Sequence, residues 1–348
     1  MRNIGRINKK TRYRAAGKAL HRTQRKNPWA GLQNGPMPQK MLRKYFCQKG
    51  ETWMNVQFGC APINWTNDDL PSLGGELTYQ QCLSEMALAG YKGSEGGCKY
   101  PKDFDTLKKA LDLRGLQICN MWFSSLFTTF ENEKTYEEFE KHMDFTYGLG
   151  ARVVGVGECG VTVHGQEGTP LYPNCPVLTE AQMNNLAEGL NELGRRAQKH
   201  GMKVCFHPHI GTGIQSMEEI DRLMELTDPA LVGLLFDTGH ATIAGADPVA
   251  ILTKYIDRIG HIHVKDVRRR VWDEVKAGSH SFLWGVKNGM FTVPGDGDCV
   301  DWRSVFDILK ASDYNGWIVV EAEQDPAKAD PLEYAQKARA FMREQLGA

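Results

Sequence analysis

The chain has 348 residues, of which 41% are hydrophobic and 24% are charged. These are the values of a globular protein, and no apolar run is long enough to span a membrane. The nine cysteines are scattered and form no Cys-x-x-Cys pair, which favours reduced thiols in a cytoplasmic protein over a disulfide framework. The length allows one large α/β barrel or two smaller domains.

Residues 1–53 differ in charge from the rest of the chain. They hold 14 of the 42 Lys and Arg residues but only one of the 42 acidic residues, Glu51, so the remainder of the chain is acidic. The segment shows no sustained hydrophobic period, and we expect a basic, disordered extension, with the folded protein beginning at Met54. A transit peptide fits less well, because the segment contains no Ser. A nucleic-acid-binding arm is also disfavoured, because the body is acidic.

From residue 54 onward, strand-like and helix-like stretches alternate eight times. The apolar runs predict strands over 56–61, 91–95, 117–122, 153–158, 202–207, 231–237, 260–266 and 317–321. The amphipathic stretches predict helices over 78–89, 104–113, 135–148, 180–200, 214–226, 248–256, 302–311 and 331–345, with a long excursion over 267–300. This alternation predicts a (β/α)8 barrel over residues 54–348. An open doubly wound sheet is the alternative, but no GxGxxG turn follows the first strand.

Four successive predicted strands end in residues that can bind a metal ion. These residues are His207, Asp237, His263 and Glu321. Because the active site of such a barrel lies at the carboxyl ends of its strands, we expect the four side chains to share one site. A lone buried His is more often a satisfied core residue, but four strand ends in register indicate a divalent ion such as manganese, cobalt or zinc.

The other predicted strand ends are polar as well. They carry amides, carboxylates and an indole, which are typical of a site for a polyhydroxylated ligand. A phosphate ligand is less favoured, because no Gly-rich turn of the kind that binds phosphate stands out in the sequence. Asn67 and Asp68 could also be helix caps, and Arg268 could be solvated rather than in contact with a substrate oxygen. The candidate substrate-binding residues are Asn67, Asp68, Glu95, Lys99, Asn120, Trp122 and Arg268.

A metal with mixed nitrogen and oxygen ligands suits the enolisation of a hydroxyketone. The ion would chelate the carbonyl and a neighbouring hydroxyl while a side-chain base removes the α-proton. Glu158, His209 and His240 are the candidate catalytic residues. Reprotonation would make the protein an isomerase or epimerase, and loss of a β-hydroxyl would make it a dehydratase. Spacing alone leaves both open, and a carbohydrate sensor without activity is a third hypothesis.

Several long stretches of the chain carry a resemblance to a known family. They are residues 61–71, 84–90, 99–101, 211–215, 291–297 and 319–326. From about residue 55 to its end, the chain resembles the xylose-isomerase-like barrel superfamily and, within it, the inosose dehydratases of inositol catabolism. The resemblance implies dehydration of scyllo-inosose (2-keto-myo-inositol) to a trihydroxycyclohexane-1,2-dione. It also implies manganese or cobalt as the metal, and the family is described as using glutathione.

The superfamily commonly places its metal on Glu, Asp, His and Glu after the fifth to eighth strands. Asp237, His263 and Glu321 match the last three positions, while His207 stands at the first. Glu158 could therefore replace His207 as a ligand, or act as the base. In related enzymes the His of Asp-Thr-x-His is functional, which here is His240. A sugar or keto-glycoside isomerase or epimerase on the same barrel is the alternative function.

The resemblance also bears on the partners of the chain. It implies a small cyclitol as the substrate. We expect neither a membrane nor a nucleic acid as a partner, and the sequence leaves a homo-oligomer open.

Overall fold

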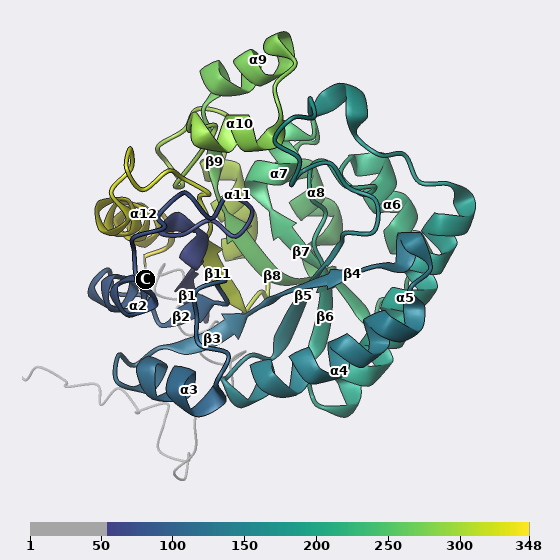
Figure 1. Ribbon diagram of the computed structural model, residues 1–348, viewed down its shortest axis with the longest axis horizontal. Helices are drawn as coiled ribbons and strands as arrows, with labels where there is room; N and C mark the ends of the chain where they lie inside the picture. Colours follow the sequence, from purple (N-terminus) through teal and green to yellow (C-terminus); the bar gives the residue numbers. More distant parts are fainter. Residues whose placement is uncertain (1–53, 348) are drawn as a thin grey trace, which may run out of the picture.

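The strands predicted from the apolar runs form one parallel sheet that curves round the centre of the molecule (Figure 1). The structure is a computed structural model that describes residues 54–347, so the predicted extension over 1–53 lies outside the described residues. The strands of this sheet are β1 (Gln57–Cys60), β2 (Gly93–Glu95), β3 (Gln117–Asn120), β4 (Trp122–Ser125), β5 (Val153–Glu158), β6 (Lys203–Phe206), β7 (Val232–Asp237), β8 (Ile259–Val264) and β11 (Trp317–Val320).

The barrel closes through the chain itself at Met121. The sheet order is β3-β2-β1-β11-β8-β7-β6-β5-β4, so its two end strands are β3 and β4. These two strands follow one another in the sequence with only Met121 between them. β3 pairs with β2, and β4 pairs with β5. The predicted third strand is therefore two short strands, and the predicted eight-position barrel is confirmed with this one interruption.

Helices surround the barrel and cover its strands (Figure 1). They bury apolar stripes against the sheet, as α5 does with Leu186, Leu190 and Leu193. Thr179 caps the start of α5, and Ser216 caps the start of α6, each in a capping box. The predicted helices correspond to α2 (Tyr79–Leu88), α3 (Phe104–Asp112), α4 (Asn132–Gly148), α5 (Glu180–Lys199), α6 (Met217–Leu226), α8 (Pro248–Tyr255), α11 (Trp302–Ala311) and α12 (Pro331–Leu346).

The predicted excursion over 267–300 is structured. It contains α9 (Arg269–Gly278), α10 (Phe282–Lys287) and the small antiparallel pair of β9 (Asp266–Val267) with β10 (Phe291–Thr292). These elements have a hydrophobic cluster of their own, which includes Val271, Phe282 and Phe291. A further short helix, α7 (Thr238–Ile243), follows β7 directly. Short 3-10 helices lie at η1 (Pro62–Asn64), η2 (Phe127–Thr129), η3 (Tyr172–Asn174) and η4 (Ile256–Arg258).

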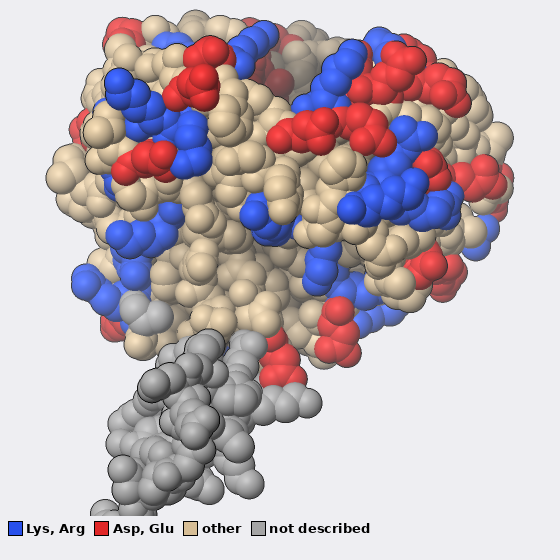
Figure 2. Space-filling model, turned by 90° about the horizontal axis from the view of Figure 1, so that it is seen from below, with Lys and Arg blue, Asp and Glu red and all other residues tan. Residues whose placement is uncertain are grey.

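The face of the molecule shown in Figure 2 is mixed in charge. On the face in Figure 2, Lys and Arg side chains are interspersed with Asp and Glu side chains, and neither sign covers a continuous area of this face. Within residues 54–347, none of the helices has both the length and the apolar character that a membrane span needs.

Candidate metal centre and active site

The structure brings the four predicted metal ligands together at the carboxyl ends of neighbouring strands. Asp237 ends β7, His263 lies in β8, and His207 and Glu321 directly follow β6 and β11. The imidazole Nε2 of His207 lies 3.5 Å from Oδ2 of Asp237. The Nδ1 of His263 lies 3.4 Å from the same oxygen and 3.1 Å from Oε2 of Glu321.

Each of these four side chains directs a polar atom into the cluster, and three of these atoms are buried without a hydrogen bond. Among the described residues, His207 Nε2, Asp237 Oδ2 and His263 Nδ1 lack a hydrogen-bond partner, whereas Glu321 Oε2 lies 2.7 Å from the ammonium of Lys265. Such atoms are rare, because leaving one unpaired costs about 1–3 kcal/mol. Two imidazole nitrogens and two carboxylate oxygens are suitable ligands for a divalent transition ion. The residues present therefore fit a metal site.

The Asp237 carboxylate is oriented by the backbone that follows it. Its Oδ1 accepts hydrogen bonds from the amides of Gly239 and His240, at 2.8 and 2.9 Å, and so caps α7. The second oxygen, Oδ2, is consequently directed away from the helix and toward His207 and His263. The sharp turn from β7 into α7 thus sets the geometry of this ligand.

A buried lysine, Lys265, lies beside the cluster. Its Nζ is 2.7 Å from Glu321 Oε2, 2.6 Å from Glu323 Oε1 and 3.4 Å from Asp237 Oδ2. Burial alone would lower the pKa of this ammonium, but Asp237, Glu321 and Glu323 hold that pKa above its usual range. Lys265 is therefore a fixed positive charge in the site. The sequence contains a signal that could have placed Lys265 in the site. Residues 261, 263 and 265 are spaced by two, so Lys265 lies on the same strand face as His261 and His263.

His209 and His240 lie against one another next to this lysine. Their ring centroids are 3.7 Å apart, and burial lowers the pKa of both imidazoles, so both are neutral at neutral pH. Nδ1 of His209 donates to the carbonyl of Ile210 at 2.8 Å, which leaves a lone pair on Nε2. Nε2 of His240 accepts from the Lys265 ammonium at 3.0 Å, which leaves the proton on Nδ1. The two rings therefore have opposite tautomers.

A cavity of about 450 Å³ lies above the cluster. Four of the predicted substrate-binding residues line it: Asp68, Glu95, Asn120 and Trp122. The Trp122 indole is 37% exposed, and its ring centroid lies 5.4 Å from that of His207. Gly157 leaves space for this indole, since a Cβ at that position would lie 2.1 Å from it. The sequence did not predict Asp69, His164 and Glu323, which also line the cavity.

Three other predicted substrate-binding residues do not line the cavity. The Lys99 ammonium donates to the carbonyls of Gly74, Gly75 and Leu77. Asn67 Oδ1 accepts from the amides of Asp69 and Leu70. Arg268 pairs with Asp296 at 2.7 Å and donates to the carbonyls of Gly289 and Phe291. The contacts of all three side chains hold loops together.

Glu158, expected to be catalytic or a metal ligand, is held by the protein itself. Its carboxylate accepts five hydrogen bonds, from Ser125 Oγ, Phe127 N, Thr128 N, Thr128 Oγ1 and Gly160 N, at 2.6 to 3.1 Å. Both oxygens are occupied, and the side chain is absent from the cavity lining. Glu158 therefore fixes the loops that follow β4 and β5, and we assign it neither metal binding nor proton transfer.

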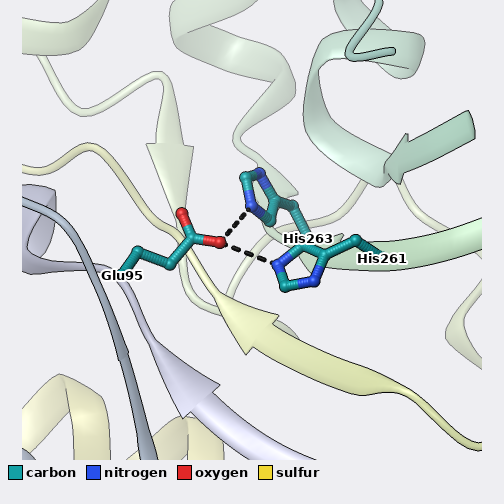
Figure 3. Close-up of side chains that lie close together, drawn as sticks. All are labelled: Glu95, His261 and His263. Atoms are coloured by element: carbon teal, nitrogen blue, oxygen red, sulfur yellow. Dashed lines mark hydrogen bonds and ion pairs between the residues drawn. The ribbon is translucent and has the colours of Figure 1, made fainter. Parts of the chain in front are cut away.

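Glu95 connects the cavity to the strand that carries His263. Its Oε1 accepts from Nε2 of His261 at 2.8 Å and from Nε2 of His263 at 2.9 Å (Figure 3). Burial would raise the pKa of the Glu95 carboxyl, but the adjacent His263 and His261 hold that pKa below its usual range. The sequence did not single out His261, although it forms a His-x-His pair with His263.

Comparisons with known proteins bear on the family and the fold. Residues 83–345 match a family model described as xylose isomerase-like TIM barrel. A curated relative from Bacillus thuringiensis named inosose dehydratase is 54% identical over 292 residues, covering 84% of this chain and 98% of the relative. A protein of the same name from Clostridium tetani is 53% identical over 289 residues, covering 83% of this chain and 97% of the relative.

Solved structures share the fold at low sequence identity. A structure described as IOLI protein with a binding zinc atom superposes with a TM-score of 0.64 at 15% identity, covering 84% of this chain and 98% of that chain. The probable 3-DHS dehydratase AsbF from Bacillus anthracis also gives a TM-score of 0.64, at 13% identity, covering 82% of this chain and 98% of that chain. At these identities, the likeness concerns the fold alone.

Proposed function

The chain belongs to the family of xylose isomerase-like TIM barrels and, within it, to the inosose dehydratases, and we propose that it is a metal-dependent hydro-lyase acting on scyllo-inosose. The products would be a trihydroxycyclohexane-1,2-dione and water. The observation that carries the proposal is the convergence of four ligand atoms, three of them without a hydrogen-bond partner, beside a cavity that His209 and His240 also line. The identity to curated relatives over nearly their whole length supports the choice of substrate.

We propose that His207, Asp237, His263 and Glu321 hold Mn²⁺ or Co²⁺. Imidazole and carboxylate donors together suit both ions. When bound, the ion supplies Lewis-acid polarisation of the ketone and stabilises the negative charge that develops on its oxygen. The family resemblance also implies glutathione. We assign no residue to it, and the assay below is run with and without it.

The cavity walls are suited to a polyhydroxylated ring. The Asp68 carboxylate and the Asn120 amide offer hydrogen-bonding groups along the wall. The exposed Trp122 indole provides an apolar surface against which the carbon face of a cyclitol can pack. Together they would hold the ring above the metal ligands and beside the two histidines.

The tautomers of the two histidines support a proposal for how the protons are transferred. Nε2 of His209 would remove the α-proton, and the electrons of that C–H bond would pass to the ketone to give an enolate. In a second step the ketone would re-form, a C=C bond would form between the α- and β-carbons, and the β C–O bond would break. The resulting enol would tautomerise to the dione. Nδ1 of His240 would protonate the departing hydroxyl, which leaves as water. The Lys265 ammonium, which already donates to Nε2 of His240, would stabilise the negative charge left on that ring. Solvent would then carry the extra proton of His209 back to Nδ1 of His240, so that both histidines recover their starting protonation states.

A direct assay separates this function from the alternatives. Metal-stripped protein is reloaded with Mn²⁺ or Co²⁺ and incubated with scyllo-inosose, with and without glutathione, and the product is analysed by mass spectrometry. A dehydratase gives a product lighter by one water, whereas an isomerase or epimerase gives a product of unchanged mass. A product of unchanged mass, or equal turnover without metal, would exclude the proposed function.

A further inference from the structure

Glu95 is the centre of a hydrogen-bond network inside the barrel. It ends β2 and is 5% exposed. A single oxygen, Oε1, accepts from Nε2 of His261, Nε2 of His263 and Nδ2 of Asn120, at 2.8, 2.9 and 3.0 Å. Both histidines belong to β8, and Asn120 ends β3. Figure 3 shows both imidazole rings directed at the same carboxylate oxygen.

These bonds cross the interior of the barrel. In the sheet order, β1 and β11 lie between β2 and β8, so the Glu95 contacts are not made between neighbouring strands. The Asn120 amide is itself oriented, because its Oδ1 accepts from the amide of Gly155 at 2.6 Å. Its Nδ2 is therefore the end that faces Glu95. This arrangement leaves the carboxylate little freedom to turn toward another partner.

The network decides which nitrogen of His263 faces the proposed metal. An ionised carboxylate only accepts hydrogen bonds, so the proton that His263 shares with Glu95 is on Nε2. The other nitrogen, Nδ1, is the one that lies 3.1 Å from Glu321 Oε2 and 3.4 Å from Asp237 Oδ2. A ligating histidine usually donates its second N–H to such an oxygen, which fixes the ring and increases its basicity.

We infer that Glu95 is the positioning residue for the metal ligand His263. It holds Nε2–H of the ring and thereby presents Nδ1 to Asp237 and Glu321. The sequence analysis expected Glu95 to bind substrate. Its Oε1 instead accepts hydrogen bonds from within the protein. This inference rests on the metal site of the proposed function. His261 and Asn120 complete the set of donors around the same oxygen.

The first test compares two buried carboxylates. Glu95→Gln keeps the shape of the side chain but removes the charge that orients His263. Glu158→Gln is the control, because it also replaces a buried carboxylate at a strand end, but one that accepts no hydrogen bond from a His. Binding of Mn²⁺ alone is titrated by the EPR signal of the free ion. We expect Glu95→Gln to weaken binding about 10- to 100-fold, and Glu158→Gln to leave it unchanged. Unchanged binding in Glu95→Gln, or an equal loss in both variants, would overturn the inference.

The second test needs no substitution and therefore does not depend on how a variant folds. The unmodified chain is labelled with ¹⁵N-histidine and loaded with Zn²⁺, which is diamagnetic. We expect NMR to show His263 coordinated through Nδ1 with a protonated Nε2. Coordination through Nε2 would contradict the inference directly.

These tests also separate the inference from the proposed function. If the unmodified chain does not dehydrate scyllo-inosose but Glu95→Gln still binds Mn²⁺ more weakly, the proposed function fails and the positioning role stands. If dehydration is observed and the Glu95→Gln titration matches that of the unmodified chain, the positioning role fails alone.

Discussion

The ammonium of Lys265 lies 3.0 Å from Nε2 of His240 and 2.6 Å from Oε1 of Glu323. Because an ammonium can only donate, this contact fixes His240 with its proton on Nδ1. The same ammonium neutralises carboxylates that would otherwise repel one another. A residue that sequence reasoning left without a committed role therefore connects the proposed acid to the proposed metal ligands.

We first predict that Lys265→Met strongly destabilises the metal-free protein. The substitution leaves Asp237, Glu321 and Glu323 buried without their common cation, and breaking a buried ion pair in this way costs about 3–5 kcal/mol. Urea unfolding of metal-free protein, followed by tryptophan fluorescence, measures the loss. Added Mn²⁺ should stabilise the variant more than the unmodified chain, because the ion can compensate part of the lost charge. A free energy of unfolding equal to that of the unmodified chain would rule out this role of Lys265.

We next predict that metal and activity are lost together at each ligand. His207→Ala, Asp237→Asn, His263→Ala and Glu321→Gln each remove one of the four converging atoms. Metal content by elemental analysis and turnover of scyllo-inosose should both fall in each variant. Glu158→Gln serves as the control and should keep its metal, since that carboxylate is occupied by loop hydrogen bonds. Full metal occupancy in any ligand variant would remove that residue from the site.

Much of the fold could be predicted because buried parallel strands leave apolar runs that are easy to recognise. The interruption at Met121 could not be predicted, because nothing in the sequence of residues 117–122 indicates a break. The register shift between β2 and β3 depends on how these two strands pair. The start of α7 could not be predicted either, because this helix follows β7 directly with no loop between them. These features arise from contacts between distant parts of the chain.

The candidate site shows a similar division. The four ligands could be predicted because each follows an apolar run on a known side of the barrel. Glu158 has the same pattern, yet its carboxylate binds the η2 loop through Ser125, Phe127 and Thr128, and a local pattern does not contain that contact. Lys99 and Arg268 likewise contact groups more than 20 residues away in sequence, which are backbone carbonyls for Lys99 and both carbonyls and the Asp296 carboxylate for Arg268. The residue types indicated which chemistry each side chain could perform. Only the tertiary structure shows which of these side chains are already hydrogen-bonded within the protein.

We also predict that Gly157→Ala weakens substrate binding without affecting the metal. A Cβ at this position would lie 2.1 Å from the Trp122 ring, so the indole must move away from the wall that it forms. The KM for scyllo-inosose should rise, while Mn²⁺ affinity stays the same. Gly165→Ala is the matched control, because a Cβ there meets no atom within 4 Å. Equal KM values for the two variants would argue against a substrate contact at Trp122.

The last prediction separates the two steps of the proposed reaction at His209 and His240. His209→Asn and His240→Asn should both keep their metal, because neither side chain provides one of the four ligand atoms, and each should lose about 10²- to 10⁴-fold in turnover. Exchange of the substrate α-hydrogen in deuterated solvent then distinguishes their roles. If Nε2 of His209 is the base, exchange stops in His209→Asn. If Nδ1 of His240 protonates the departing hydroxyl, the α-proton is still removed in His240→Asn, so exchange continues although no dione forms. Exchange that persists in His209→Asn and stops in His240→Asn would mean that the two histidines have the opposite roles.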